Sequence, residues 1–221
     1  MNMRKLVSYK INNLQEEHKM STVLYIKANA KPEGASRTFR ISDSFIEEYK
    51  RNHPNHQIII LDLYKENIAP LTADDINAIY SPKTEDSINH PVLRYAYQFA
   101  NADKYVIATP LWNLSVPGIV KLYFDYVSVV GVTFRYTSGG GVEGLLEGKK
   151  AIHITTRGGE YSKPPLSEYE LGEKYIKTIL GLFGVYDTST FAVDSMDRSG
   201  TDVEAVVANA IKDIQEKAKS F

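Results

Sequence analysis

The segment from Lys104 to Val130 constrains the fold more than any other part of the chain. It begins with an apolar, β-branched run, Tyr105 to Thr109, and continues through a loop containing Pro110 into a helix that Pro117 begins. This pattern is typical of a central strand in a parallel sheet, followed by a covering helix. In an open α/β sheet, ligands bind at loops that follow the carboxyl ends of strands. The sequence therefore predicts a ligand site at Pro110 to Leu114.

Five apolar runs have the length of strands, and helical segments alternate with them. The predicted strands are residues 23–26, 58–63, 105–109, 151–156 and 185–193, and the predicted helices include residues 39–49, 117–130, 171–183 and 203–218. Thr72 and Asp75 form a capping box for a short helix in the long connection after the second strand, and Pro91 begins another. Strands that alternate with helices predict a parallel sheet covered on both faces, as in a three-layer α/β/α sandwich.

Composition narrows the functions that such a fold can have. The chain has 221 residues, a formal net charge of -1 and no cysteine. Its length fits one domain, residues 20–221, after an N-terminal extension, residues 1–19, to which the sequence assigns no role. The balanced charge gives no basic field for nucleic acid, and no segment resembles a membrane span or signal peptide, so we expect a cytoplasmic protein. Without cysteine, redox chemistry requires a bound cofactor.

The helix predicted at residues 117–130 is apolar on every side, with Lys121, Asp125 and Ser128 as its polar residues. A sheet covers one face of a helix, so this helix needs a second burying surface. We expect that surface to be another subunit of a homodimer, with Val127 facing away from the sheet. The alternative is burial beneath the chain's own long connection.

Two further motifs carry competing interpretations. Ser36, Arg37 and Thr38 stand at a predicted helix N-terminus, where free amides and the helix dipole favour a phosphate; the alternative is that Ser36 serves as an N-cap alone. The G-x-G-x-x-G spelling at residues 139–144 precedes a strand rather than a helix, so we interpret it as a turn and not as a dinucleotide fingerprint. We expect His153 to be a packed core residue, and the histidine pattern predicts no metal site.

Three loops follow the carboxyl ends of the first, third and fourth predicted strands: residues 34–38, 110–114 and 157–159. In a flavodoxin-like sheet of order 2-1-3-4-5 these strands are neighbours, so the loops converge on one site. The first loop suits a phosphate. The other two offer an aromatic wall and free backbone amides, which suit a flat heteroaromatic ring that becomes anionic on reduction.

At these residues the chain resembles the FMN-dependent NADH-azoreductases, which also act as quinone reductases. The resemblance runs from Met20 almost to the C-terminus and is carried by residues 36–38, 110–125, 131–137 and 155–159. It implies a flavodoxin-like homodimer with one tightly bound, non-covalent FMN per subunit and each site completed by the partner. It also implies a ping-pong, two-electron hydride transfer through flavin N5, from NADH, with NADPH as a possible donor, to quinone or azo acceptors. No side chain is then required as a catalytic group.

The resemblance also assigns roles by position. Ser36, Arg37 and Thr38 would hold the phosphate, and Asn113 would present its backbone amide to N5. The flavin ring would be lined by Pro110, Leu111, Trp112, Asn113 and Leu114, and its pyrimidine end by Thr156, Arg157, Gly158 and Gly159. The acceptor pocket would include Trp112, Leu114, Tyr136 and Leu182. Trp112, Leu114 and Leu182, like Asn29 beside the phosphate, differ from the usual residues of the family, so acceptor preference is expected to depend on the pocket wall.

Two other functions fit the same architecture. One is a flavodoxin-type electron carrier with no substrate turnover of its own, although such carriers are typically smaller and strongly acidic. The other is an FAD-dependent quinone reductase, which a phosphate loop alone does not exclude.

Overall fold

The structure, a computed structural model, describes residues 20–32, 34–84, 87 and 89–221. The N-terminal extension predicted at residues 1–19 lies outside the described residues. The sheet contains β1 (Thr22–Lys27), β2 (Gln57–Asp62), β3 (Lys104–Pro110), β6 (Lys150–Thr156) and β7 (Asp187–Val193). Its five strands are all parallel and follow the order β2-β1-β3-β6-β7, which confirms the predicted order 2-1-3-4-5.

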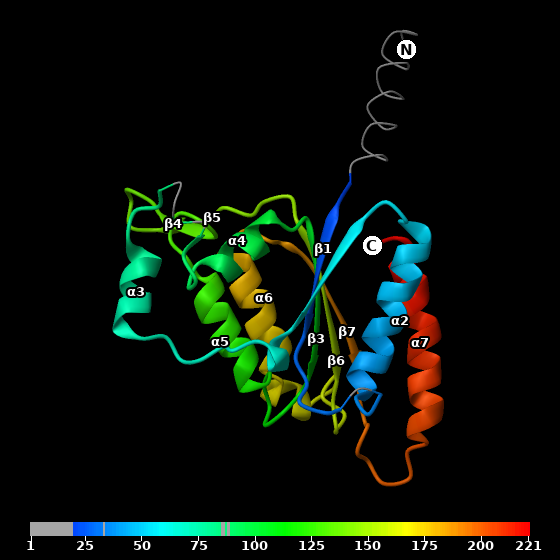
Figure 1. The fold of residues 1–221 in the computed structure, drawn as a ribbon. Helices are drawn as coiled ribbons and strands as arrows, with labels where there is room; N and C mark the ends of the chain where they lie inside the picture. Colours follow the sequence, from blue (N-terminus) through cyan, green and yellow to red (C-terminus); the bar gives the residue numbers. More distant parts are fainter. Residues whose placement is uncertain (1–19, 33, 85–86, 88) are drawn as a thin grey trace, which may run out of the picture.

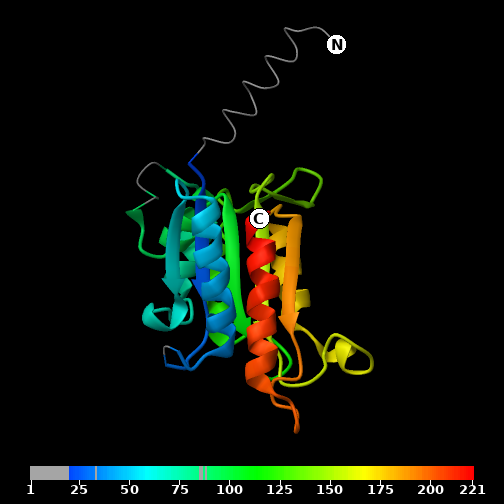
Figure 2. The ribbon, with the colours of Figure 1, turned by 90° about the vertical axis from the view of Figure 1, so that its right-hand side faces the viewer.

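Helices cover both faces of this sheet (Figure 1). One face carries α2 (Arg37–Asn52) and α7 (Val203–Lys219), and the other carries α4 (Arg94–Asn101), α5 (Gly118–Val127) and α6 (Gly172–Leu182). Alternate strand residues supply the two cores: Val23 and Tyr25 pack toward α2 and α7, whereas Leu24 and Ile26 pack toward the opposite face. Figure 2 shows α2 and α7 side by side across the sheet. The predicted α/β/α sandwich is confirmed.

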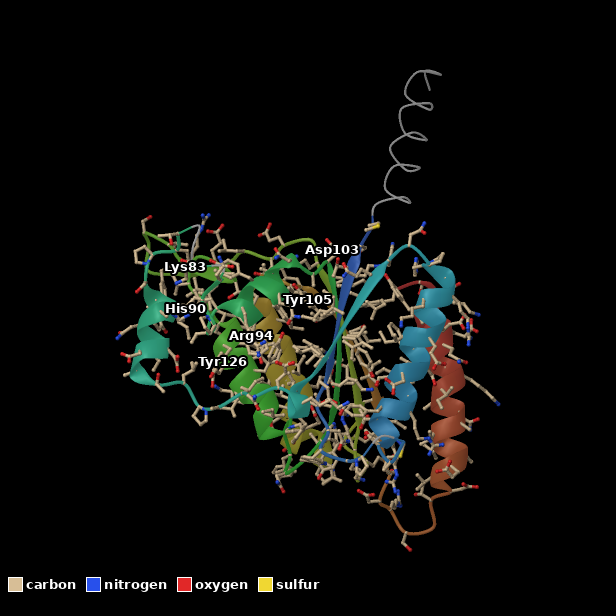
Figure 3. All side chains as sticks on the ribbon, in the orientation of Figure 1. Lys83, His90, Arg94, Asp103, Tyr105 and Tyr126 are labelled. Carbon is tan, nitrogen blue, oxygen red and sulfur yellow. The ribbon has the colours of Figure 1, made fainter. Side chains whose placement is uncertain are left out.

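The long connection after β2 covers part of α5. It contains a short helical turn, η1 (Leu63–Lys65), and α3 (Ala73–Tyr80), whose N-terminus has the predicted capping box of Thr72 and Asp75. Tyr126 on α5 packs in a small cluster with Ile79 and donates a hydrogen bond from its Oη to the carbonyl oxygen of Ala69 at 3.0 Å. Figure 3 shows Tyr126 near α3 and α4, beside the labelled Arg94 and His90. The connection therefore supplies burial that the sequence assigned first to a partner subunit.

The predicted orientation of α5 was wrong at Val127. That side chain is 0% exposed and packs in the core between α5 and the sheet, so it does not face away from the sheet. The helix also ends at Val127 rather than Val130. Because α5 has apolar residues on every side, periodicity did not determine which face is turned to the sheet. Ile119 and Leu122 on this helix are half-buried.

A short hairpin, β4 (Phe134–Tyr136) and β5 (Val142–Gly144), follows α5. Gly140 in its turn has φ of 79°, and Thr137 N–H donates to the Gly141 carbonyl oxygen at 2.9 Å. The glycine run is therefore a turn that joins two strands, which confirms that it is not a dinucleotide fingerprint. Among the described residues, no helix is long and apolar enough to cross a membrane.

Candidate functional site

A cleft lies at the carboxyl edge of the sheet. The carboxyl ends of the strands are at the bottom of Figures 1 and 2. Its walls come from the loops that follow β1, β3, β6 and β7 and from the first turn of α2. The residues that line it are Asn29, Lys31, Arg37, Thr38, Pro110, Leu111, Trp112, Thr156, Arg157, Gly158, Met196 and Asp197. The three predicted loops thus converge, and the loop after β7 joins them.

Ser36 is the N-cap of α2, as the simpler interpretation of this residue predicted. Its Oγ accepts a hydrogen bond from Phe39 N–H at 3.2 Å and another from Asn29 Nδ2 at 2.9 Å. The cap leaves the N–H groups of Arg37 and Thr38, in the first turn, without partners among the described residues. Lys31 and Arg37 add positive charge at the same lip of the cleft. This end of the cleft therefore has the free N–H groups and the positive charge that suit an anion.

The buried hydroxyl of Thr38 fixes α2 against the end of β6. Its Oγ1 lies 2.7 Å from Oγ1 of Thr156, and both residues line the cleft. Arg37 reaches across to the loop after β7, where its Nη1 donates to the Met196 carbonyl oxygen and to Asp197 Oδ1, each at 2.8 Å. These contacts hold opposite walls of the cleft at a fixed separation.

The loop after β3 makes a tight turn with unusual backbone angles. Asn113 and Leu114 have φ of 49° and 70°, and mutual hydrogen bonds between the backbones of Trp112 and Ser115, at 2.8 and 3.1 Å, close the turn. A left-handed conformation is costly for leucine, by about 1 to 2 kcal/mol. Within the described part of the chain, the N–H of Asn113 has no hydrogen-bond partner. The turn therefore leaves an amide donor free to bind a ligand.

The loops after β6 and β7 are joined through their backbones. Met196 N–H donates to the Arg157 carbonyl oxygen at 3.0 Å, Asp197 N–H to that of Gly158 at 3.1 Å, and Ser195 N–H to that of Gly159 at 3.0 Å. The carbonyl groups of residues 157–159 are thereby occupied. The N–H groups of Gly158 and Gly159 have no partner among the described residues, so they remain available as donors.

The side chain of Arg157 points away from these amides into a buried ion cluster. Its Nη2 lies 2.9 Å from Glu173 and 3.5 Å from Glu170, and its Nη1 lies 3.6 Å from Asp194. Burial alone raises the pKa of Glu173, but hydrogen bonds from Lys177 and Arg157 outweigh it and hold that pKa below its usual value. The backbone of Arg157 is thus at the cleft, whereas its charge fixes the loop to α6 from behind.

His153 lies in the core below the cleft. It is 3% exposed, and its Nε2 lies 2.9 Å from Oγ1 of Thr109 on the neighbouring strand. Burial, reinforced by the positive charge of Arg157, lowers the pKa of His153 to about 3. The imidazole is therefore neutral near pH 7, as expected for a packed histidine. Among the described residues, no three His, Cys, Asp or Glu side chains gather as a metal site.

The comparisons agree with this geometry. Residues 21–218 match the family described as Flavodoxin-like fold. The FMN-dependent NADH:quinone oxidoreductase of Clostridium perfringens is 57% identical over 202 residues, which cover 91% of this chain and 100% of that protein. The protein of the same name from Caldicellulosiruptor saccharolyticus is 55% identical over the same shares of the two chains.

The chain belongs to this family of flavodoxin-like NADH:quinone oxidoreductases. Among solved structures, the azoreductase from Bacillus anthracis strain Sterne is 32% identical and superposes with a TM-score of 0.82, over 91% of this chain and 100% of that one. Of the four sequence blocks that suggested the family, those at residues 36–38, 110–125 and 155–159 contribute residues to the cleft, whereas the block at residues 131–137 does not line it.

Two residues predicted for the acceptor pocket lie away from the cleft of their own chain. Leu182 ends α6, whose first residue, Gly172, is near Leu111 at the cleft, so Leu182 lies at the opposite end of the helix (Figure 1). Tyr136 is 58% exposed on the hairpin, which lies beside the same distant end of α6. Trp112 and Leu114, in contrast, are 37% and 38% exposed on the loop after β3.

Four residues that line the cleft were not predicted to do so from the sequence. Asn29 and Lys31 lie in a predicted loop but were not assigned as ligand contacts, and Met196 and Asp197 were not considered. The signal for the last two was present, because residues 194–199 follow the carboxyl end of the fifth strand, just as the predicted loops follow the other strands. That polar segment has no glycine-rich or proline-bounded pattern that would have drawn attention to it.

Proposed function

We propose that this protein is an FMN-dependent NADH:quinone oxidoreductase that also reduces azo compounds. One observation carries the proposal: the first turn of α2, which suits an anion, and Gly158, whose amide is free, line the same cleft. A flavin mononucleotide has one phosphate and one flat ring with an electron-accepting pyrimidine edge, and this arrangement matches both ends. The names of the relatives, at 57% and 55% identity, support FMN, NADH and a quinone acceptor. The likeness to an azoreductase, at 32% identity, supports azo compounds as acceptors.

The residues present fit FMN. The N–H groups of Arg37 and Thr38, with the charges of Lys31 and Arg37, would hold the phosphate, and Ser36 orients them as the cap. Pro110, Leu111, Trp112, Asn113 and Leu114 would lie against the ring. Thr156, Arg157, Gly158 and Gly159 would surround its pyrimidine end, the last three through their backbones.

Bound FMN would supply the chemistry, by accepting a hydride from NADH and passing two electrons to the acceptor in a ping-pong cycle. The protein's own groups would orient the flavin and stabilise its reduced state. The N–H of Asn113, which the tight turn leaves free, would bind on the N5 side of the ring, and the amides of Gly158 and Gly159 would favour the negative charge of the reduced ring. His153 supplies no proton, because it is buried and neutral. Trp112 and Leu114, exposed at the rim, select the acceptor.

We propose further that the enzyme is a cytoplasmic homodimer. The resemblance assigns Tyr136 and Leu182 to the acceptor pocket, and since both lie away from the cleft of their own chain, a second copy is what would bring them to it. Sedimentation equilibrium of the native protein should give twice the chain mass of 24.9 kDa. A monomer at micromolar concentration would contradict the shared site.

The phosphate assignment includes the Thr38 hydroxyl, which can accept a hydrogen bond from Thr156 Oγ1 at 2.7 Å and donate its own hydrogen to a phosphate oxygen. Thr38→Val keeps the side-chain shape but removes this hydroxyl. Loss of a hydrogen bond that supports a charged group should weaken FMN binding by roughly 10- to 100-fold. Thr178→Val is the matched control, because Thr178 is exposed on α6 and donates to its own helix at Lys174. Equal FMN affinity in both variants would refute the assignment.

Turnover and cofactor identity separate the alternatives. Sustained NADH consumption with a quinone is expected for an enzyme, whereas a flavodoxin-type carrier would stop after one reduction of its own flavin. The flavin released by heat should be FMN. Recovery of FAD alone would favour the FAD-dependent reductase.

A further inference from the structure

An ion pair joins two residues of the cleft that lie far apart in the sequence. Nη1 of Arg37, in the first turn of α2, lies 2.8 Å from Oδ1 of Asp197, in the loop after β7, and both residues line the cleft. The pair therefore places one positive and one negative charge on the wall that faces the ligand.

The second carboxylate oxygen of Asp197 faces Gly158. A Cβ atom added to Gly158 would lie 2.8 Å from Asp197 Oδ2, so this oxygen occupies the space beside the glycine. The proposed function places Gly158 at the pyrimidine end of FMN. A carboxylate at that position is unexpected, since the reduced ring is negatively charged and like charges repel.

The loop that carries Asp197 is held in place. Asp197 N–H donates to the Gly158 carbonyl oxygen at 3.1 Å, and Ser195, with a left-handed φ of 63°, turns the chain so that its N–H donates to Gly159. Arg37 adds a second contact with this loop, through the carbonyl oxygen of Met196 at 2.8 Å. The carboxylate of Asp197 is thus directed to Gly158 by its backbone as well as by its ion pair.

We propose that Asp197 and Arg37 set the reduction potential of the bound flavin as opposed charges: Asp197 lowers it and Arg37 raises it. This inference rests on the proposed function. The reduced ring carries more negative charge than the oxidised ring, so a neighbouring carboxylate disfavours the reduced state and a guanidinium favours it. Neither residue takes part in hydride transfer. Together they hold the potential between the two values that either charge alone would give.

The two single variants distinguish this electrostatic role from a structural one. Asp197→Asn and Arg37→Gln both break the same ion pair, so a role limited to holding the loop predicts changes of the same sign. Opposed charges predict changes of opposite sign. Arg37→Gln also weakens phosphate binding, but that loss is common to oxidised and reduced FMN and cancels in the ratio of their dissociation constants.

The experiment measures the dissociation constants of oxidised FMN, in air, and of dithionite-reduced FMN, without oxygen, for the apoprotein of each variant. In Asp197→Asn the dissociation constant of oxidised FMN, divided by that of reduced FMN, should rise about three- to tenfold. This is equivalent to a reduction potential of the bound flavin that is higher by about 15 to 30 mV for a two-electron couple. In Arg37→Gln the same ratio should fall by a similar factor. The size is modest because both side chains are partly exposed and solvent screens them. The double variant should return close to the native ratio.

Arg40→Gln and Glu204→Gln are the controls. Arg40 and Glu204 form an ion pair, at 2.7 Å, that connects α2 with α7. Neither residue lines the cleft, so the ratio of the two dissociation constants should stay native in both controls. If the native chain binds FMN and the two cleft variants shift the ratio in the same direction, or not at all, the inference is overturned while the proposed function stands. A native chain that binds no FMN overturns both.

Discussion

Replacing Arg157 with methionine should lower the free energy of unfolding by about 3 to 5 kcal/mol. The guanidinium is 2% exposed, and its partners Glu170 and Asp194 are 7% and 15% exposed at their side chains. Removal of the guanidinium leaves those carboxylates in a poorly solvated place without the cation with which they form ion pairs, which is the costly way to break a buried ion pair. Methionine preserves most of the aliphatic volume, so a cavity contributes little.

The assay is urea denaturation of the apoprotein, compared with Arg40→Met. Arg40 and Glu204 form a surface pair, 36% and 73% exposed, so that control should cost about 0 to 1 kcal/mol. If Arg157→Met proves no more destabilising than Arg40→Met, the buried cluster does not support the loop as argued.

The pH dependence gives a second criterion for the same variant. The pKa of Glu173 is held below its usual value in the folded protein, so its stabilisation is present above the unfolded pKa of about 4.3 and is lost as pH falls through the folded value. In Arg157→Met, Glu173 loses one of the hydrogen bonds that hold its pKa below the usual value. The difference between native and variant stability should therefore be largest near pH 7 and shrink as the pH falls toward the carboxylate range. A difference that is independent of pH would refute the electrostatic explanation.

Two further predictions concern buried positions. Burial and the charge of Arg157 lower the pKa of His153 to about 3, so nitrogen NMR should show a neutral imidazole down to about pH 4. The contribution of His153 to the free energy of unfolding should decline as pH falls below about 6.5, because only the unfolded chain then binds the proton. An imidazole that titrates near 6.5 would contradict its burial. Gly144→Ala should destabilise strongly in thermal unfolding, because the added Cβ would lie 2.1 Å from the Gly184 nitrogen, whereas Gly139→Ala meets nothing within 4 Å and should be mild. Equal melting temperatures would show that the hairpin does not pack as described.

The sheet and its order followed from the sequence because the first four strands contain short apolar runs and strand segments alternate with periodic helices. The three-residue strands of the hairpin did not, since β4 and β5 are too short to show alternation. Hydrophobic periodicity also failed to predict the orientation of Val127, because a helix that is apolar on every side has no face marked as the buried one. The long connection then covered part of the surface that had been assigned to a partner.

The part of the site that is formed by loops at the carboxyl ends of strands could be predicted from the sequence. Loops at the carboxyl ends of neighbouring parallel strands must meet, and this placed Thr38, Pro110 and Gly158 together before any coordinates. The direction of the Arg157 side chain was not predictable, because it depends on carboxylates that follow it by 13 to 37 residues, from Glu170 to Asp194. Asp197 escaped notice for the same reason: its importance arises from a tertiary contact with Arg37.

The measurement that tests the account most directly is an anaerobic titration of the purified protein after it has been incubated with FMN. The account predicts that FMN stays bound through gel filtration, that NADH bleaches its visible absorbance, and that menadione restores it through repeated cycles. A protein that retains no flavin, or a bound flavin that NADH does not reduce, would contradict the central claim that this cleft is the site of an NADH:quinone oxidoreductase.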